Sequence, residues 1–438
     1  MQRERHKKNS GNDMMHHILT GFGFGPIQAG LFVKEAFASN NFDRIVIAEI
    51  DQRLVEALRQ EGGEYHVNVA QKKGIEVKKI ENIELLNPDS SADRKRMVEA
   101  ISGSTEIVTA LPSVDFYDAG GSSSVAGLIA EGFEKSRVDT TIVYAAENHN
   151  QAAEILAELV RKTIGVIENR QVQFLNTVIG KMSRVVTDQE EMEKLGLAPI
   201  CSGINRAFLV EQFNRILVSR CTLQKFRPGI SVFVEKDQLL PFEEAKLYGH
   251  NAIHSLLGYL GMMKEYEKMT EVGTDPALMN IARSAFLNES GAALIKKYKN
   301  LGEELFTEDG YRHYCDDLLE RMINAWLNDT PQRAVRDPVR KLGLKDRIFG
   351  TMALALEFGI EPNNMAVGAA AGLRHLLENP SEYNLPEELR FDAHKNLERE
   401  QIEEQLRWLW QGQFGRFGAD IVELVYKAQE KIKEIVGV

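Results

Sequence analysis

The run from His17 to Asp51 constrains the fold of this chain more than any other stretch. Residues 17–20 form a short strand-like run, and GFGFGPIQAG follows as a glycine-rich turn into an apolar-periodic helix. The run RIVIAEID at residues 44–51 then has the pattern of a second strand. Two strands joined by one helix are the unit of an open, mostly parallel sheet. The pattern therefore predicts an α/β domain of the Rossmann type.

The glycines of this turn predict a binding site for a dinucleotide cofactor. Gly23 permits a tight turn, and Gly25 lets the backbone approach a pyrophosphate at the start of the helix. The third position of the usual GxGxxG pattern holds Gln28, so we expect Gly30 to provide the close packing of helix against strand. The residues assigned to the cofactor in this turn are Gly23, Gly25, Pro26, Ile27 and Gly30.

An acidic residue at the tip of the second strand indicates which cofactor binds. Glu49 lies about twenty residues beyond the turn, where a carboxylate accepts the ribose hydroxyls of NAD and repels the 2′-phosphate of NADP. Asp51 is the second candidate for this role. A structural turn with a solvated acid is the competing interpretation. The strand–turn–helix–strand context favours NAD.

Two polar residues beyond a later strand are also expected to line the cofactor site. Strands are predicted at residues 106–111 and 141–145, and Glu147 and Asn148 follow the second of them. Residues just past the carboxyl ends of strands face the ligand crevice of an open α/β sheet. For Asn148, a helix cap is the alternative role.

The composition divides the chain into three segments. A basic, polar tail at residues 1–16 lacks the apolar core of a secretory signal and is expected to be disordered. Residues 17–231 are predicted to form the NAD-binding domain, with an antiparallel pair at residues 65–69 and around Val77. Helical periodicity then predicts an all-helical C-terminal substrate domain at residues 232–438.

The stretch KLYGHNAIHSLLGYLG, residues 246–261, is predicted to be a helix with one polar flank. At about 100° per residue, that flank carries four polar side chains with two glycines beside them: Lys246, His250, Asn251, His254, Gly258 and Gly261. A lysine, an amide and an imidazole in one arc can transfer a proton, bind an oxygen and orient the group that carries it. A surface helix with packing glycines is the alternative.

Composition argues against several classes of protein. The net charge of −11, without a basic stripe rich in aromatic residues, disfavours nucleic-acid binding. Three cysteines without CxxC spacing indicate a reducing compartment, and no Cys/His spacing predicts a metal site. No apolar run reaches the ~18 residues of a membrane span. We expect a cytoplasmic, small-molecule-binding protein that is a monomer or small homo-oligomer, with no nucleic-acid, membrane or metal partner.

Several motifs together resemble the polyol-specific long-chain dehydrogenase/reductase family, which includes the mannitol dehydrogenases. The family marker, Lys followed by Asn after four residues and His after two more, matches Lys246, Asn251 and His254. GFGPIQAG, IAEID, AAEN, FLNTVIGKM and RDPVRKLGLKDR follow in the family's order. The chain departs from the family at Gln28, at Gly180-Lys181 where Asp-Arg is usual, and in its greater length.

The resemblance implies a dehydrogenase that uses NAD and side chains rather than zinc. By this resemblance, Lys246 is the general base in oxidation, and its pKa must fall towards neutrality. The amides of Asn251 and Asn176 match the pair that polarises the reacting oxygen. His254 matches the residue that holds a substrate hydroxyl.

The basic stretch QRAVRDPVRKLGLKDR, residues 332–347, carries six Arg or Lys residues in an acidic chain. A solvated face is the usual explanation of such a run. A similar stretch adjoins the substrate in family members that act on phosphorylated polyols, which implies Arg336, Arg340 and Lys341 as phosphate ligands. The implied reaction interconverts a sugar-alcohol phosphate and a ketose phosphate, with mannitol 1-phosphate and fructose 6-phosphate as first choice. An unphosphorylated polyol or uronate substrate, or an idle NAD-binding sensor or scaffold, remain alternatives.

Overall fold

The computed structural model describes residues 17–165, 170–224 and 226–436, and these fall into two compact units. The first unit extends to residue 237 without residues 72–74, and the second consists mainly of residues 238 onward. The sequence placed this change at residue 232. The structural division lies later because the strand β12 (Phe233–Lys236) pairs with a strand of the first unit. The predicted tail at residues 1–16 lies outside the described residues.

The first unit is built on an eight-stranded sheet. In spatial order its strands are β12, β11 (Ile216–Ser219), β8 (Gln171–Ile179), β7 (Thr140–Ala145), β6 (Glu106–Thr109), β1 (Ile18–Phe22), β2 (Arg44–Ala48) and β5 (Ile83–Leu86). The run from β8 to β5 is parallel, and only β11 pairs antiparallel with its neighbour β8. With β1 central, this is the doubly wound order of dinucleotide-binding domains. The α/β prediction is confirmed.

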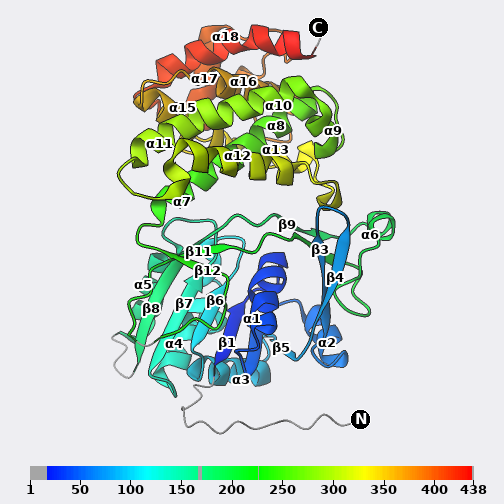
Figure 1. Ribbon diagram of the computed structural model, residues 1–438, viewed down its shortest axis with the longest axis vertical. Helices are drawn as coiled ribbons and strands as arrows, with labels where there is room; N and C mark the ends of the chain where they lie inside the picture. Colours follow the sequence, from blue (N-terminus) through cyan, green and yellow to red (C-terminus); the bar gives the residue numbers. More distant parts are fainter. Residues whose placement is uncertain (1–16, 166–169, 225, 437–438) are drawn as a thin grey trace. The chain divides into compact units, whose positions relative to one another are not determined.

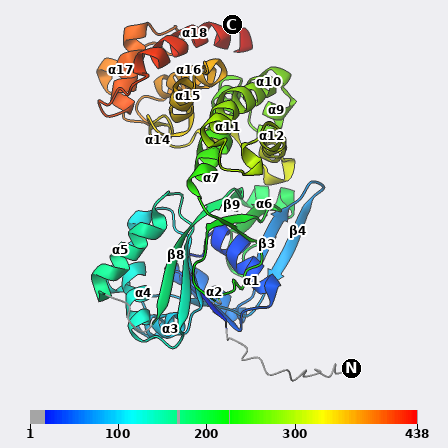
Figure 2. The same ribbon diagram turned by 60° about the vertical axis from the view of Figure 1, so that its left-hand side comes forward.

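Helices cover both faces of this sheet (Figures 1 and 2). Successive strand residues point to opposite faces, so Ile45 and Ile47 join one apolar core while Val46 joins the other. The first core is covered by α1 (Lys34–Ser39) and α2 (Gln52–Gln60). The second is covered by α3 (Ser91–Ser102), α4 (Val125–Glu134) and α5 (Ala152–Ile164).

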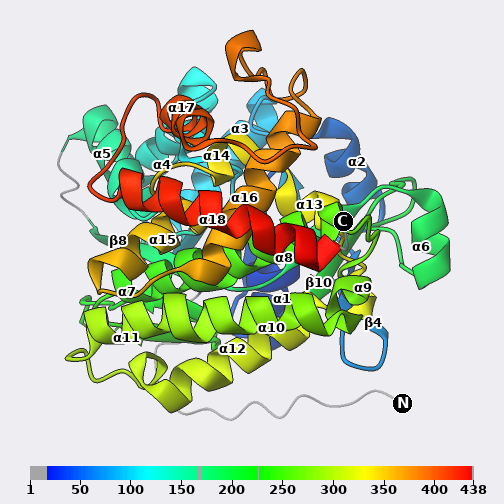
Figure 3. The ribbon, with the colours of Figure 1, turned by 90° about the horizontal axis from the view of Figure 1, so that it is seen from above.

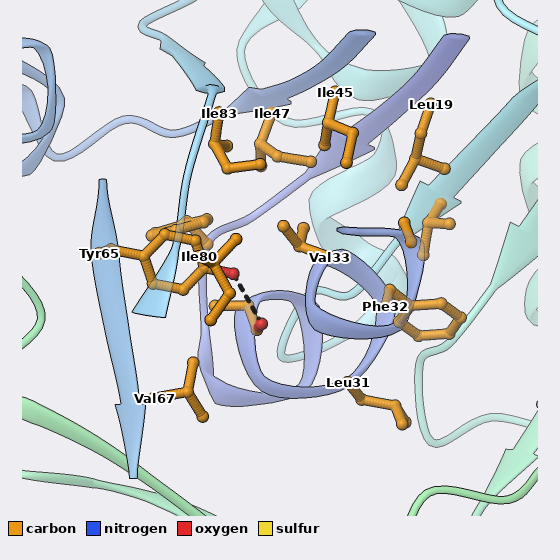
Figure 4. Close-up of a cluster of buried hydrophobic side chains, with 14 of the residues drawn as sticks. Leu19, Leu31, Phe32, Val33, Ile45, Ile47, Tyr65, Val67, Ile80 and Ile83 are labelled. Atoms are coloured by element: carbon orange, nitrogen blue, oxygen red, sulfur yellow. Dashed lines mark hydrogen bonds between the residues drawn. The ribbon is translucent and has the colours of Figure 1, made fainter. Parts of the chain in front are cut away.

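A four-stranded sheet packs over the helical segment Gln28–Val33, which precedes α1 in the same unit. Its order is β4 (Ile75–Ile80), β3 (Tyr65–Ala70), β10 (Ala207–Glu211) and β9 (Ser183–Val186). β3 and β4 are the antiparallel pair that the sequence predicted. Figure 4 shows Tyr65 among the buried aliphatic side chains between the sheets, where its hydroxyl donates to the carbonyl of Ala29 at 2.8 Å.

The glycine-rich turn packs in a way that the sequence did not predict. The helix after it opens as a π-helix, Gln28–Val33, and a Cβ on Gly30 would lie 2.5 Å from Val210 of β10. Gly30 therefore packs closely against a strand, and that strand is β10 of the four-stranded sheet. The close approach to β1 occurs at Gly21, where a Cβ would lie 1.9 Å from the side-chain nitrogen of Gln28. Gln28 thus occupies the space that Gly21 leaves open.

The second unit is helical. Its helices are α7 (Leu240–Glu244), α8 (Ala252–Met263), α9 (Met269–Thr274), α10 (Pro276–Ser284), α11 (Ala292–Tyr298), α12 (Glu308–Met322), α13 (Pro331–Val335), α14 (Pro338–Lys341), α15 (Arg347–Glu357), α16 (Asn363–Glu378), α17 (Arg399–Leu409) and α18 (Gly418–Val436). Figure 3 shows α18 running along α16. Among the described residues, none of the helices is long and apolar enough to cross a membrane.

Helix α8 is the buried centre of this unit. Its residues from Ser255 to Gly261 are buried on every side of the helix. A Cβ on Gly258 would lie 2.6 Å from Ala334, and one on Gly261 would lie 3.0 Å from Pro331. The two glycines therefore let α13 lie directly against α8, as a pair of packing glycines should.

We expect the pair Gly21 and Gln28 to be energetically coupled. Gly21→Ala should lower the free energy of unfolding by about 1–3 kcal/mol, because the new methyl group overlaps the Gln28 amide and approaches Ile47. Gln28→Ala alone should have a smaller effect. It opens a gap but removes two buried polar atoms that have no hydrogen-bond partner among the described residues.

The double variant tests this packing. If Gln28 fills the space above Gly21, Gly21→Ala with Gln28→Ala should recover much of the stability that Gly21→Ala loses, with a coupling energy of roughly 0.5–3 kcal/mol. Urea unfolding, monitored by circular dichroism, gives the free energy of unfolding of each variant and therefore the coupling energy. Strictly additive effects would contradict the packing.

Candidate active site

The turn after β1 forms a backbone site suited to a pyrophosphate. Gly23 has φ +80°, and a Cβ there would lie 3.0 Å from the carbonyl oxygen of Ala110, so the turn requires glycine. A Cβ on Gly25 would meet no atom within 4 Å, so this side of the turn is open. The helix begins at Pro26, followed by Ile27, and the Ala29 N–H donates to the Gly25 carbonyl at 2.8 Å. The first backbone N–H groups of a helix are available to an anion.

Glu49 is held at this turn. Its carboxylate accepts hydrogen bonds from the backbone N–H of Phe24 and of Asp51, each at 2.9 Å. Asp51, the second candidate, instead caps α2 by accepting from the Leu54 N–H at 3.2 Å, and it pairs with Arg206. Glu49 is therefore the carboxylate beside the turn, and Asp51 has a structural role.

Glu147 lies beneath the surface and links two strand ends. Its carboxylate accepts from the Thr109 hydroxyl at 2.8 Å, from the Leu111 N–H at 2.9 Å and from the Tyr117 hydroxyl. Burial raises its pKa, and these hydrogen bonds oppose the rise. Glu147 could therefore influence a cofactor only indirectly, because its carboxylate holds the backbone that follows β6. Asn148, the next residue, is exposed.

Asn176 lies near the end of β8 and binds the start of α5. Its side-chain oxygen accepts from the Ala153 N–H at 2.9 Å, and its NH₂ group donates to Glu154 at 2.8 Å. An amide NH₂ carries two N–H groups, so a second donor remains for a substrate oxygen. The sequence singled out Asn176 as a site residue but did not predict its contacts with the start of α5.

Lys181, where this chain departs from the family pattern, has a structural position. Its side chain is buried, and its ammonium donates to the backbone carbonyls of Glu211 and Phe213. Lys181 therefore joins the turn after β8 to the end of β10.

The polar flank predicted at Lys246 belongs to a π-helical segment. Residues Ala245–Asn251 form a π-helix that continues from α7 into α8. The positions expected from 100° per residue are therefore wrong for Lys246 to Asn251, because a π-helix has wider turns with i→i+5 hydrogen bonds. Such segments occur often at functional sites.

Lys246 is partly buried, and its amine is easier to deprotonate than that of a solvated lysine. Its pKa is lowered to about 8, first by burial and then by the charge of Arg347, while the charge of Glu243 opposes both effects. His250 is buried, and its pKa is lowered well below the usual value by burial first and then by Arg321. The neutral imidazole is therefore the form favoured at His250.

His254 contacts a carboxylate that sequence reasoning missed. The ring nitrogen Nε2 of His254 lies 3.0 Å from Oδ2 of Asp329, whose side chain is 2% exposed. The other oxygen of Asp329 accepts from the Thr330 N–H at 2.9 Å and from Arg333 at 2.8 Å. Burial alone would raise the pKa of Asp329, but the hydrogen bond from His254 and the charges of His254 and Arg333 lower it overall. In the sequence Asp329 resembles an ordinary residue at a helix start.

The three predicted phosphate ligands differ in their surroundings. Arg336 and Arg340 are exposed, and Arg340 pairs with Asp337 and, at 3.4 Å, with Asp346. Lys341 is buried and donates to the Ala334 carbonyl at 2.9 Å. Its pKa is lowered to about 7, first by burial and then by the charges of three arginines: Arg347, Arg340 and Arg336.

Arg347 connects this cluster electrostatically to Lys246. Its side chain is 13% exposed and donates to the Ser255 hydroxyl of α8 at 3.3 Å. Its charge contributes to the lowered pKa of both Lys246 and Lys341. The sequence included Arg347 in the basic run but gave no signal that distinguished it from its exposed neighbours. Among the residues that the structure describes, no three His, Cys, Asp or Glu side chains form a cluster that could hold a metal ion.

The chain is similar to known polyol dehydrogenases in sequence and in fold. Residues 238–435 match the model of the mannitol dehydrogenase C-terminal domain. The mannitol-1-phosphate 5-dehydrogenase of Geobacillus stearothermophilus is 27% identical over 370 residues, which cover 82% of this chain and 88% of that protein. The enzyme of the same name from Buchnera aphidicola is 24% identical over 369 residues, covering 82% and 87%.

Two solved structures share this fold over nearly the whole chain. A D-sorbitol dehydrogenase aligns with a TM-score of 0.75 at 15% identity, covering 97% of this chain and 94% of that one. Mannitol 2-dehydrogenase of Pseudomonas fluorescens, in a complex with NAD and D-mannitol, aligns with a TM-score of 0.69 at 16% identity and the same coverage. A family domain thus matches the C-terminal unit, and relatives of one kind, 24–27% identical, cover most of the chain.

Proposed function

We propose that this protein is an NAD-dependent oxidoreductase that interconverts a sugar-alcohol phosphate and a ketose phosphate, with mannitol 1-phosphate and fructose 6-phosphate as the first pair to test. The observation that carries the proposal is a lysine with its pKa lowered to about 8, in the helix that also carries Asn251 and His254. The names of the curated relatives support the phosphorylated substrate.

The first unit fits the cofactor that this reaction needs. Gly23, Gly25 and the helix start at Pro26 and Ile27 suit the pyrophosphate, and Glu49 suits the ribose hydroxyls. Glu147 would hold the backbone at the strand end, with Asn148 beside it. When bound, NAD supplies the acceptor for the hydride that leaves the carbinol carbon.

The second unit supplies the groups that handle the proton. Lys246 takes the hydroxyl proton during oxidation and returns it during reduction, and a pKa near the working pH suits both directions. The amide of Asn251 donates to the oxygen as it becomes a carbonyl, and His254 holds a neighbouring hydroxyl. Asn176 remains the predicted second amide donor.

The phosphate is proposed to bind the basic cluster of Arg336, Arg340 and Lys341. Support comes from the pKa of the buried Lys341, which burial and the charges of Arg347, Arg340 and Arg336 lower, since a bound dianion relieves positive charges held together. One observation favours an unphosphorylated polyol instead: Arg340 is 54% exposed and already pairs with two aspartates.

A substrate panel separates these two substrates. We expect the parent protein to reduce NAD with mannitol 1-phosphate far better than with mannitol, as read from NADH absorbance. Arg336→Ala or Arg340→Ala should weaken the phosphorylated substrate by about 1.5–3 kcal/mol for each charge-assisted hydrogen bond lost, and barely change activity on the free polyol.

Arg312→Ala is a matched control for Arg340→Ala. Arg312 is also 54% exposed and also pairs with an aspartate three residues away, but it lies on α12 outside the basic run. Arg312→Ala should leave the activities on mannitol 1-phosphate and on mannitol near those of the parent. Equal effects of the cluster variants on mannitol and mannitol 1-phosphate would make the cluster a solvated face and favour the unphosphorylated substrate.

Glu49 should set the preference for NAD over NADP. Glu49→Ser removes the carboxylate beside the turn, so the ratio of kcat/KM with NAD to kcat/KM with NADP should fall by the equivalent of several kcal/mol at most. Glu56→Ser, which removes an exposed carboxylate from α2, should leave that ratio unchanged. A parent protein that already prefers NADP would show that the assignment of Glu49 is wrong.

A further inference from the structure

We infer that Asp329 is a positioning residue that fixes which ring nitrogen of His254 faces the substrate. The inference rests on the proposed function, because it concerns the hydroxyl that His254 is proposed to hold. Asp329 lies before α13, and His254 lies on α8. Their side chains meet at 3.0 Å, between Nε2 of the ring and Oδ2 of the carboxylate.

The hydrogen bonds around Asp329 leave one arrangement of protons. Its Oδ1 accepts two N–H groups, from the backbone of Thr330 at 2.9 Å and from Arg333 at 2.8 Å. A carboxylate with these partners is an acceptor on both oxygens, so Nε2 of His254 must carry the proton that lies between ring and carboxylate. In the neutral ring, Nδ1 then carries a lone pair.

The backbone around Asp329 is fixed from both sides. Its carbonyl accepts from the Met269 N–H at 2.9 Å, and the Thr330 hydroxyl caps α13 by accepting from the Arg333 N–H at 3.1 Å. The contacts of Gly258 and Gly261 hold α13 against α8. The carboxylate therefore reaches His254 from a rigid element, as an orienting group should.

A lone pair on Nδ1 supplies what the other proposed groups lack. The amide of Asn251 donates N–H groups to the reacting oxygen, and Lys246 becomes a donor once it has taken the proton. A hydroxyl on the neighbouring carbon needs an acceptor for its own proton, and Nδ1 of His254 is that acceptor.

Asp329→Asn tests the inference with almost no change in shape. The Thr330 and Arg333 donors require an oxygen, so the amide oxygen of the new side chain should face them and its NH₂ group should face Nε2. That NH₂ group donates to Nε2 and moves the ring proton to Nδ1. We expect kcat/KM for the polyol phosphate to fall by about 10–10²-fold, the scale of one lost hydrogen bond to a substrate hydroxyl, while NADH binding stays near that of the parent.

A double-mutant cycle separates positioning from a general structural effect. In a His254→Ala background, Asp329→Asn should change kcat/KM by no more than about threefold, because there is no ring left to orient. Asp309→Asn alters an exposed aspartate that pairs with Arg312. It should leave kcat/KM unchanged both in the parent protein and in His254→Ala. Equal losses from Asp329→Asn with and without His254 would overturn the inference.

Nitrogen-15 NMR of histidine-labelled protein gives a readout independent of activity. The parent should show His254 protonated at Nε2 and Asp329→Asn should show it protonated at Nδ1. A parent ring protonated at Nδ1 would overturn the inference even if the variant failed to fold. If the parent oxidised no polyol phosphate, the proposed function would fail, while the NMR result would still decide how Asp329 orients His254.

Discussion

The second unit depends on the burial of several positive charges close to one another. Lys246, Lys341 and Arg347 all have lowered pKa values, with burial as the first cause in each case. Removal from water penalises a cation, and neighbouring cations add to that penalty. The same penalty makes an amine available as a base near neutral pH and makes a bound anion favourable. The proposed proton transfer and the proposed phosphate binding would therefore have one physical origin in this unit.

The helix packing keeps these groups in place. α8 is buried on all sides, and its two glycines bring α13 close enough for Asp329 to meet His254. Ser255 of the same helix accepts from Arg347 at the start of α15. Because one central helix contacts both of these segments, a change in its packing would move the proposed catalytic and binding groups together.

The parts of the molecule that follow from local sequence pattern were predictable. The strand–turn–helix–strand pattern with Glu49 led to the doubly wound sheet, and helical periodicity led to the C-terminal helical unit. The marker at Lys246, Asn251 and His254 led to the resemblance to polyol dehydrogenases. These features depend on the spacing of residues along the chain, and that spacing can be read from a single sequence.

Features that depend on contacts between distant segments could not be predicted. Gly21 and Gln28 are seven residues apart, but only the packing of the helix on β1 shows that one fills the space left by the other. The π-helix at Lys246 has no distinct residue pattern, and nothing local links Asp329 to His254, 75 residues away in the chain. Burial distinguishes Arg347 from Arg336 and Arg340 of the same basic run, and the sequence does not show burial.

The pH dependence of NAD-linked oxidation tests the central claim, that Lys246 is the base whose pKa the second unit lowers. For mannitol 1-phosphate, kcat/KM should rise by about tenfold per pH unit below about pH 8, where Lys246 is protonated, and level off above it. Lys246→Ala should lose about 10²–10⁴-fold in turnover together with this rise, with NADH binding retained. A Lys246→Ala protein within about tenfold of the parent, or one that keeps the same rise with pH, would contradict the account.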